Sequence, residues 1–274
     1  MKTDYRNLRK IASDIRIKTL ELLYEAGSGH LGSCMSVIET LVSLYFSGLF
    51  KYNSQKPESE DRDYFLLSNG HACPAFYVLL AKASYFPESK LDNSLFKLNT
   101  GLEGHPVRGS LPGIEISSGS LGMGLSVGEG IALGLKLKKK ENKVVVMMSD
   151  GEQQEGSTWE AVMAASHYKL NNLIAIIDRN GIQIGGRIKD NMKIEPLAKK
   201  YQSFGWKVIK VNGHNFNKLI LSLKKAFKAK KPTLIIAKTI PAKGVYKLEG
   251  RKDTHHPHLS EDIYKKSIKR LKND

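Results

Sequence analysis

Apolar side chains recur along this chain in two patterns, one typical of helices and one typical of buried strands. Over residues 4–25 the apolar positions follow a helical spacing, which predicts an amphipathic helix that ends at Gly27. Short continuous apolar runs bounded by polar residues or glycine predict buried strands at 64–67, 143–148, 173–177, 207–211 and 233–239.

Segments of helical character separate these strands. They are expected at 36–46, 74–85, 125–139, 195–205 and 216–228, with a polar helix near 89–98 and a small-residue helix that opens near Gly156 and Ser157. Strands that alternate with helices predict an α/β fold, with a parallel sheet covered by helices on both faces. Because no repeat or linker interrupts the pattern, residues 1–274 are expected to form a single domain.

Irregular stretches rich in glycine connect several of these elements. One precedes residue 36 and holds His30, a polar loop covers 53–63, and a glycine- and proline-rich stretch covers 101–124. The last is the longest, and a loop of that length within a compact domain usually carries function.

The strongest candidate chemistry lies around the strand at 143–148. Asp150 comes directly after it, and Asn180 follows the strand at 173–177. The carboxyl ends of parallel strands share one edge of the sheet, so the two side chains can meet there. Carboxylate and amide oxygens suit a hard divalent cation such as Mg²⁺. Gly151 allows close backbone approach, and the helix opening near Gly156 offers free N–H groups to an anion.

Three histidines add to this picture. His30, His71 and His105 each follow a glycine directly, and each lies in an irregular loop. Taken singly, each has the surroundings of a solvated loop histidine. Taken together above one sheet edge, neutral imidazoles would supply donors and acceptors for a polyhydroxylated, phosphorylated ligand.

Composition and charge narrow the possible classes of protein. The chain has 274 residues, of which 41% are hydrophobic, which is enough for one large domain. Two cysteines, Cys34 and Cys73, provide neither a disulfide framework nor a CxxC metal site, which favours the cytoplasm. No apolar run approaches the roughly 20 residues that cross a membrane.

The formal net charge is +16, and much of it lies in the lysine-rich stretches 136–143, 224–231 and 265–272. We interpret these stretches as solvated helix faces without interleaved aromatic residues. Nucleic-acid binding, or a non-catalytic basic scaffold, is the alternative that the charge alone suggests. Sugar phosphates and acidic proteins are compatible partners.

The segment around Asp150 resembles the thiamine-diphosphate motif of transketolases. Asp-Gly at 150–151, the spacing to Asn180, and the flanking EQQEG, KLNNLIAIID and IQIGG all match that family, although Ser149 stands in place of its usual first glycine. The stretches SGHLG, LSNGHA, EGHP and SSGSLGMG follow one another in the family's order. The tail TIPAKGVYKLEGRKDTHHPHLS is similar to its KGKGV…WHG region, with Thr254 for tryptophan and His256 for glycine.

The resemblance implies thiamine diphosphate as cofactor, held through Mg²⁺ with Ca²⁺ or Mn²⁺ as substitutes. It implies that Asp150, Asn180 and the carbonyl of Ile182 bind the metal. His30 and His105 would contact the sugar near the reacting carbon, and His71 would contact both substrate and cofactor. The implied cofactor-binding residues are His71, Gly119, Ser120, Leu121, Asp150, Gly151, Glu152, Glu155, Asn180, Ile182 and His255. Of these, Glu155 matches a glutamate in the network that links paired active sites.

Transketolases continue into a pyrimidine-binding domain and a carboxyl-terminal domain, and residues 1–274 match neither. The resemblance therefore implies the amino-terminal, diphosphate-binding subunit of a split transketolase. Its partner would be a separate carboxyl-terminal subunit in a two-plus-two heterotetramer. The reaction would be transfer of a two-carbon ketol unit from a ketose to an aldose, either of them free or phosphorylated.

Other classes remain open at this point. The α subunit of a 2-oxo acid dehydrogenase, or a fragment similar to deoxyxylulose-phosphate synthase, would share the metal motif but lack these histidine loops. A dinucleotide-binding oxidoreductase is suggested by GSLGMG at 119–124, but no strand directly precedes it. A zinc site from His255, His256 and His258 is discounted because cysteines and a second ligand pair are missing. Tight binding of thiamine diphosphate with Mg²⁺ would separate the enzyme from a basic scaffold.

Overall fold

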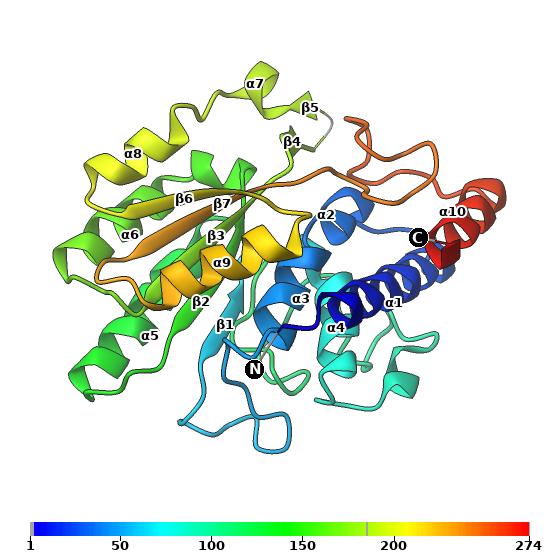
Figure 1. Cartoon of the computed structure of the whole chain (residues 1–274). Coiled ribbons are helices and arrows are strands. Elements are labelled where there is room, and N and C mark those ends of the chain that lie inside the picture. The colour runs from blue at the N-terminus through cyan, green and yellow to red at the C-terminus, as the bar shows by residue number, and fades with distance from the viewer. Residues whose placement is uncertain (1–2, 185, 274) are drawn as a thin grey trace.

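The computed structural model describes residues 3–184 and 186–273 (Figure 1). Within these residues five parallel strands form one sheet in the order β1-β2-β3-β7-β6. The strands are β1 (Tyr64–Leu67), β2 (Val144–Ser149), β3 (Leu173–Arg179), β6 (Lys207–Asn212) and β7 (Thr233–Lys238). The expected fold class, a parallel sheet between helices, is confirmed.

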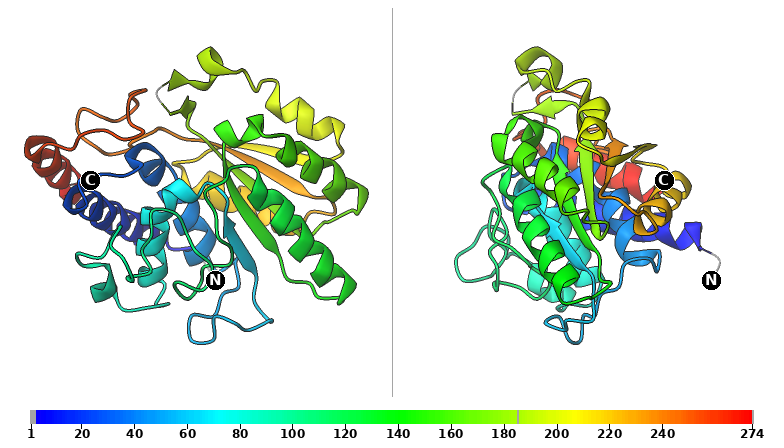
Figure 2. Two further views of the ribbon diagram at one scale, coloured as in Figure 1. Left: turned by 180° about the vertical axis from the view of Figure 1, so that it is seen from behind. Right: turned by 90° about the vertical axis from the view of Figure 1, so that its left-hand side faces the viewer.

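Helices cover both faces of the sheet, as Figure 2 shows from two sides. One face carries α1 (Tyr5–Glu25), α2 (Leu31–Ser36), α3 (Ile38–Phe46), α4 (Cys73–Lys82) and α9 (Phe216–Phe227). The other carries α5 (Met123–Leu137), α6 (Gly156–His167) and α8 (Leu197–Ser203).

Two cores follow from this layering. Along β2, Val145 and Met147 belong to one core, and Val144, Val146 and Met148 belong to the other. Because successive side chains of a strand point to opposite faces, a strand covered on both sides must be apolar throughout. This explains why the inner strands β2, β3 and β7 appear in the sequence as largely apolar runs.

The first helix shows how local sequence sets an element. The Asp4 side chain caps α1 by accepting hydrogen bonds from the backbone N–H groups of Arg6 at 3.0 Å and Asn7 at 3.1 Å. Its apolar stripe, which includes Leu8 and Ile15, is buried. The helix expected at 4–25 is therefore confirmed.

Some expected elements differ from the structure. The helix expected near 89–98 is wrong: only the short 3₁₀ helix η2 (Glu88–Leu91) forms there. Asn93, Phe96 and Asn99 have positive φ angles of 51°, 62° and 60°, which a right-handed helix does not allow. The glycine loop after Gly27 is shorter than expected because α2 begins directly after His30.

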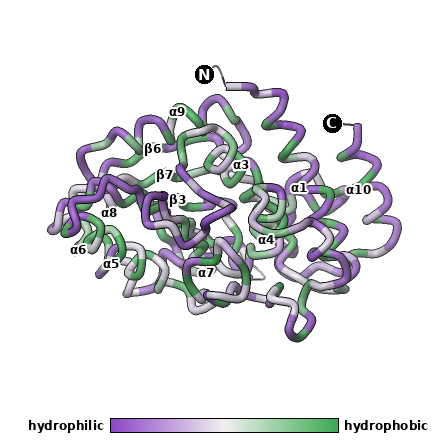
Figure 3. Tube along the Cα trace, turned by 90° about the horizontal axis from the view of Figure 1, so that it is seen from below, coloured by the Kyte–Doolittle hydropathy of each residue, from purple (hydrophilic) through white to green (hydrophobic). Residues whose placement is uncertain are grey.

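Three short elements were not expected from the sequence: the strands β4 (Ile182–Gln183) and β5 (Gly186–Arg187), which form a hairpin, and the helix α7 (Ile188–Asn191). The terminal helix α10 (Glu261–Asn273) contains the lysine-rich stretch 265–272 that we interpret as a solvated helix face, and it packs along α1. In Figure 3 hydrophilic positions dominate the trace of α10, as expected for a lysine-rich surface helix. Among the described residues no helix combines the length and apolar character needed to span a membrane.

Candidate functional site

The candidate site lies at the carboxyl edge of the sheet. The loop after β1 leads into the 3₁₀ helix η1 (Gly70–Ala72), and Asp150 and Asn180 follow β2 and β3. The backbone N–H of Ser68 donates to the carbonyl of Met147 at 2.8 Å, which ties the first of these loops to β2. The register of β1, β2 and β3 therefore brings these three loops to one edge.

Asp150 carries a buried oxygen that is free for a further ligand. The side chain is 1% exposed, and its Oδ2 accepts from Arg179 Nη1 and from the Gly181 N–H, both at 2.7 Å. Its Oδ1 is buried and has no hydrogen-bond partner among the described residues. Burial raises the pKa of Asp150, and the charge of Arg179 opposes that shift. A buried carboxylate oxygen left unpaired is costly in a folded protein and fits a metal ligand.

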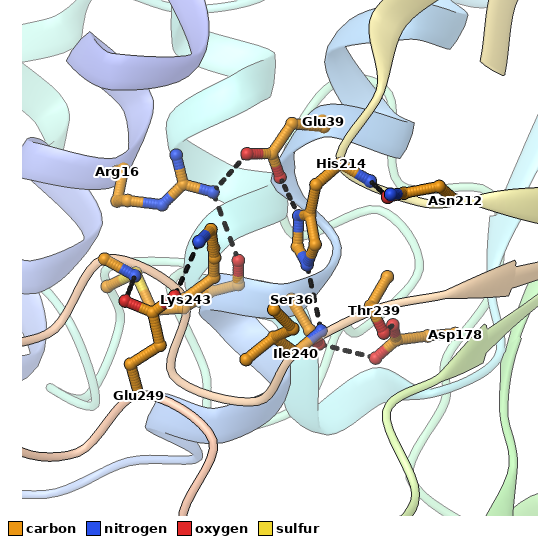
Figure 4. Close-up of polar contacts among 12 residues, drawn as sticks. Arg16, Ser36, Glu39, Asp178, Asn212, His214, Thr239, Ile240, Lys243 and Glu249 are labelled. Carbon is orange, nitrogen blue, oxygen red and sulfur yellow. Dashed lines mark hydrogen bonds and ion pairs between the residues drawn. The ribbon is translucent and has the colours of Figure 1, made fainter. Parts of the chain in front are cut away.

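The Asn180 amide is held in one orientation. Its Nδ2 donates to Asp178 Oδ2 at 3.0 Å, and its Oδ1 accepts from the Ile182 N–H at 2.9 Å. Asp178 is fixed in turn by hydroxyl groups of Ser36, at 2.5 Å, and Thr239 (Figure 4). Burial raises the pKa of Asp178 to about 6. The structure thus brings Asp150, after β2, next to the segment after β3 that carries Asn180 and continues into β4 at Ile182.

Glu152, expected in the cofactor site, links three segments of the protein. It is fully buried, and its carboxylate accepts from the Ser68 hydroxyl, from the Gly122 N–H at 2.8 Å and from the Ser149 N–H at 3.2 Å. These bonds join the ends of β1 and β2 to the start of α5. Its contact with a cofactor stays a prediction.

The irregular stretch before α5 passes next to His105. Gly119 has φ 144°, and a Cβ atom at this position would lie 3.3 Å from the His105 ring. Glycine at position 119 is therefore required for the backbone to pass this close to the imidazole. The next two residues differ in burial: Ser120 is exposed and Leu121 is half-buried. Glu155, expected in a network between paired sites, is exposed.

The loop histidines converge, as expected from the sequence. The ring centre of His30 lies 5.2 Å from that of His71, 5.9 Å from His105, 4.6 Å from His255 and 4.0 Å from His256. Burial, followed by the neighbouring imidazoles, lowers the pKa of His30 to about 2 and that of His71 to about 4. Burial also lowers the pKa of His105 and His255. These four imidazoles are therefore neutral near pH 7.

The tail reaches the histidines through Thr254. The Thr254 carbonyl accepts from the Gly32 N–H at 2.8 Å, and its side chain is buried. This contact places His255 and His256 against His30. The structure is therefore compatible with the alignment of the tail to the family's KGKGV…WHG region, in which His255 matches the histidine. Contact of His255 with a diphosphate stays a prediction.

Sequence reasoning missed several residues at this edge. One of them is Arg179, which binds Asp150. Asn69 is fully buried, and neither of its amide atoms has a partner among the described residues; the same is true of Gln183 Oε1. The SNGH stretch could have indicated Asn69. His256 was noted in the sequence at the family's glycine position, but its contact with His30 was not predicted. Buried polar atoms without a protein partner in this part of the described chain are suited to binding a polar ligand, because buried polar groups are normally hydrogen-bonded.

The described parts of the chain also contain cavities beside and away from this edge. One of about 570 Å³ lies between the loop that ends at His30 and the tail that begins at Pro257. Another of about 480 Å³ lies between α1, α9 and α10 and is lined by Arg16, Glu39 and His214. The first is lined by Gly29 and Leu31, on either side of His30 in the chain, and by His258, whereas the second lies among the outer helices.

Comparison with known proteins identifies the family. The model of the transketolase thiamine diphosphate binding domain matches residues 8–273. An apulose-4-phosphate transketolase subunit from Phocaeicola vulgatus is 38% identical over 257 residues, which are 93% of this chain and 90% of that protein. The 6-deoxy-6-sulfo-D-fructose transketolase subunit SqwG of a Clostridium species is 36% identical and covers 98% of this chain and 97% of its own length.

Full-length enzymes match over part of their length. Human transketolase is 36% identical over 96% of this chain and 42% of its own length. The crystal structure of transketolase from Campylobacter jejuni superposes with a TM-score of 0.93 at 31% identity, over 98% of this chain and 43% of that one. This chain therefore belongs to the transketolase family and has the fold of its thiamine diphosphate binding domain.

Proposed function

We propose that this chain is the diphosphate-binding subunit of a split transketolase, which transfers a two-carbon ketol unit from a ketose to an aldose. The observation that carries the proposal is the buried Oδ1 of Asp150, which has no partner among residues 3–184 and 186–273 and lies next to the Asn180 segment, at the edge where neutral imidazoles converge. The near-complete coverage of two relatives named as transketolase subunits supports the division into separate chains.

The residues present fit a metal and a diphosphate. The Asp150 carboxylate, the Asn180 amide oxygen and the Ile182 carbonyl would bind Mg²⁺, because all three are hard oxygen donors and Mg²⁺ completes its shell with phosphate and water. When bound, thiamine diphosphate supplies the electron sink for breaking and making a carbon–carbon bond next to a carbonyl. Gly119 and Leu121 would lie beside its rings, and His255 beside its diphosphate.

The histidines of this chain would act on the sugar. His30, His71 and His105 are neutral, so each can donate one hydrogen bond and accept another. A neutral imidazole at a sugar hydroxyl can orient that oxygen and take or return its proton. His71 is oriented for this purpose, because its Nε2 lies 3.1 Å from the hydroxyl of Ser33.

A partner with pyrimidine-binding and carboxyl-terminal domains would complete the site. Close to Leu121, the outer side of α5 exposes Met123 (50%) and Val127 (39%), and the neighbouring α6 exposes Met163 (57%). Side chains of this kind on adjacent helices are suited to a protein interface. We propose that the partner covers this surface, in an assembly of two copies of each chain.

The names of the two subunit relatives suggest substrates, and the cysteines suggest a compartment. The two subunit relatives are named for apulose-4-phosphate and for 6-deoxy-6-sulfo-D-fructose, so ketoses with an anionic group at the far end are the first to test. Cys34 and Cys73 are buried free thiols, and we propose a reducing compartment, the cytoplasm.

The test is to combine this chain with a separately expressed pyrimidine-domain subunit, thiamine diphosphate and Mg²⁺. Two-carbon transfer from a panel of ketose phosphates and sulfonates to aldose acceptors is then measured. Transfer that requires both chains is the expected result. Decarboxylation of 2-oxo acids without transfer between sugars would assign the pair to another class of thiamine diphosphate enzyme.

A further inference from the structure

Three imidazoles from the two ends of the chain lie together at the mouth of the site. His30 comes from the loop before α2, and His255 and His256 come from the tail after β7. One ring nitrogen of each lies within 4.8 Å of the others. The Nε2 atoms of His30 and His256 are 3.0 Å apart.

The backbone holds these two segments against each other. Gly29 has φ 142°, and a Cβ atom there would clash with the Leu23 side chain, so only glycine allows the chain to enter His30 in this way. A Cβ atom on Gly32 would lie 2.8 Å from the Thr254 hydroxyl, which shows how closely the tail docks. The Thr254 hydroxyl donates to the Arg251 carbonyl at 3.1 Å and fixes the turn before His255.

The ligand set points to one class of cation. Zn²⁺ bound by nitrogen atoms at roughly 2.0–2.1 Å in a tetrahedron places those atoms about 3.3 Å apart, close to the separation of His30 and His256. Neutral imidazoles suit Zn²⁺, Co²⁺, Ni²⁺ and Cu²⁺, whereas Mg²⁺ and Ca²⁺ require oxygen ligands. We propose that His30, His255 and His256 form a binding site for Zn²⁺, with the fourth position open to water or an anion.

The site has a consequence that rests on the proposed function. His30 and His255 are expected to contact the sugar and the cofactor diphosphate, so a metal ion bound to them would occupy the same space. Zn²⁺ and the loaded cofactor should therefore exclude each other. Zn²⁺ would act as an inhibitor against which thiamine diphosphate with Mg²⁺ protects.

Metal binding can be tested on this chain without its partner. Co²⁺ is titrated as a visible probe of tetrahedral nitrogen coordination, and Zn²⁺ is then added to displace it. His256→Gly should weaken Co²⁺ binding by at least about tenfold through loss of one ligand. His256→Cys keeps a zinc ligand and should retain Zn²⁺ binding. His258→Gln changes an exposed neighbour outside the cluster and should behave as the wild type.

The outcomes decide between the possibilities. A tetrahedral Co²⁺ spectrum in the wild type, with at least about tenfold weaker Co²⁺ binding in His256→Gly and an unchanged melting temperature, supports the site. Equal Co²⁺ affinity in wild type and His256→Gly, or no Co²⁺ spectrum in the wild type, overturns it. If Zn²⁺ binds as expected but thiamine diphosphate with Mg²⁺ binds at Asp150 without displacing it, the site stands and the assigned role of His255 fails.

Discussion

Asp150 offers the sharpest test at the scale of single residues. Its Oδ1 has no partner within the described chain, whereas Oδ2 is held by Arg179 and Gly181. Asp150→Asn keeps the shape of the side chain but removes the charge that a divalent cation needs. We expect the Mg²⁺-dependent affinity for thiamine diphosphate to fall about a hundredfold, because contacts to charged groups contribute about 2–3 kcal/mol. Calorimetric titration of the assembled enzyme measures it.

Glu195→Gln is the matched control for that variant. Glu195 also contacts Arg179, at 3.5 Å, but it is exposed and stands outside the predicted metal ligands. It should leave cofactor affinity unchanged. An Asp150→Asn enzyme with full cofactor affinity would contradict the metal assignment. Equal losses of cofactor affinity in both variants would show that the loss comes from the changed contact with Arg179 and not from a missing metal ligand.

We expect variants of the loop histidines to lose catalysis while they keep cofactor binding. His30→Ala and His105→Ala should retain near-normal affinity for thiamine diphosphate, while kcat/KM for two-carbon transfer falls by about a hundredfold if proton transfer at a sugar hydroxyl is lost. Steady-state kinetics of the assembled enzyme and calorimetry on the same samples supply both numbers. Parallel losses of cofactor and substrate binding would instead indicate that these imidazoles hold the loops in place.

At the scale of elements, the sequence predicted those parts of the fold in which burial decides the conformation. The apolar runs of β2 and β3 are long because both faces of the sheet are covered, and their edges were placed within one or two residues. The helix predicted near 89–98 is wrong because the turns in this region depend on residues in the left-handed conformation, such as Asn93. That conformation follows from tertiary packing. The α2 helix was missed because its glycine and serine content is typical of a loop.

In the site, too, some contacts could be predicted from the sequence and others depend on tertiary packing. Parallel strands end at one edge, so the meeting of Asp150 with the Asn180 loop could be predicted from spacing alone. The pairing of Arg179 with Asp150 depends on a side-chain direction that no spacing encodes. The contact of His30 with His256 joins positions that are far apart in the sequence, and only the docking of the tail reveals it.

One buried ion pair couples α1, α3 and the loop after β6. Glu39 accepts from Arg16 at 2.7 Å and from His214 Nδ1 at 3.0 Å, while His214 Nε2 accepts from the Ile240 N–H (Figure 4). The Ile240 bond places the His214 proton on Nδ1. Burial alone would raise the pKa of Glu39, but Arg16 and His214 outweigh it and lower that pKa to about 2.

This pKa fixes the pH range in which the pair stabilises the protein. Because the folded-state pKa lies below the ordinary glutamate value of 4.5, the contribution is complete above pH 4.5 and is lost as pH falls towards about 2. Glu39→Gln should therefore lower the free energy of unfolding at pH 7 by about 3 kcal/mol. Urea unfolding at pH 7 and at pH 3.5 should show a smaller difference between wild type and variant at the lower pH. A difference that is independent of pH would contradict the assignment.

The outer side of α5 carries the prediction for the partner interface. Val127→Asp places a charge one helical turn from Met123 and should weaken binding of the pyrimidine-domain subunit by at least about tenfold, because an unpaired charge would be buried in the interface. Leu221→Asp on α9, over the opposite face of the sheet, changes a side chain that is 51% exposed and serves as the control. Sedimentation of each variant with the partner measures assembly, and equal binding by both variants would exclude this surface.

At the scale of the whole molecule, one cluster of lysines lies at the edge of the sheet opposite the candidate chemistry. A cavity of about 470 Å³ next to the amino-terminal ends of β2 and β7 is lined by Lys136, Lys139, Lys140, Lys143, Lys228 and Lys230. The six residues of β2 lie between Lys143 and Asp150, and the seven residue steps span about 23 Å. Since exposed charges are screened beyond about 8–10 Å in physiological salt, these lysines act on solubility or on another partner and not on the sugar.

The position of the candidate site at an open edge leads to the last prediction, that this chain by itself does not transfer ketol units. In the proposed assembly the diphosphate lies on this chain, while the aminopyrimidine ring and the glutamate that activates it belong to the partner. The purified chain should therefore show neither proton exchange at C2 of thiamine diphosphate nor two-carbon transfer, and both should appear on mixing.

Assembly should also depend on the cofactor, because a ligand held by both chains stabilises the assembled state by RT ln(1 + [L]/Kd), about 2.7 kcal/mol when its concentration is a hundredfold above Kd. Thiamine diphosphate with Mg²⁺ should then tighten association of the two chains by about a hundredfold, and Asp150→Asn should remove most of that gain. Sedimentation with and without cofactor measures the linkage. Full two-carbon transfer by this chain alone would refute the division of labour and would require an acid next to the aminopyrimidine ring from within residues 1–274.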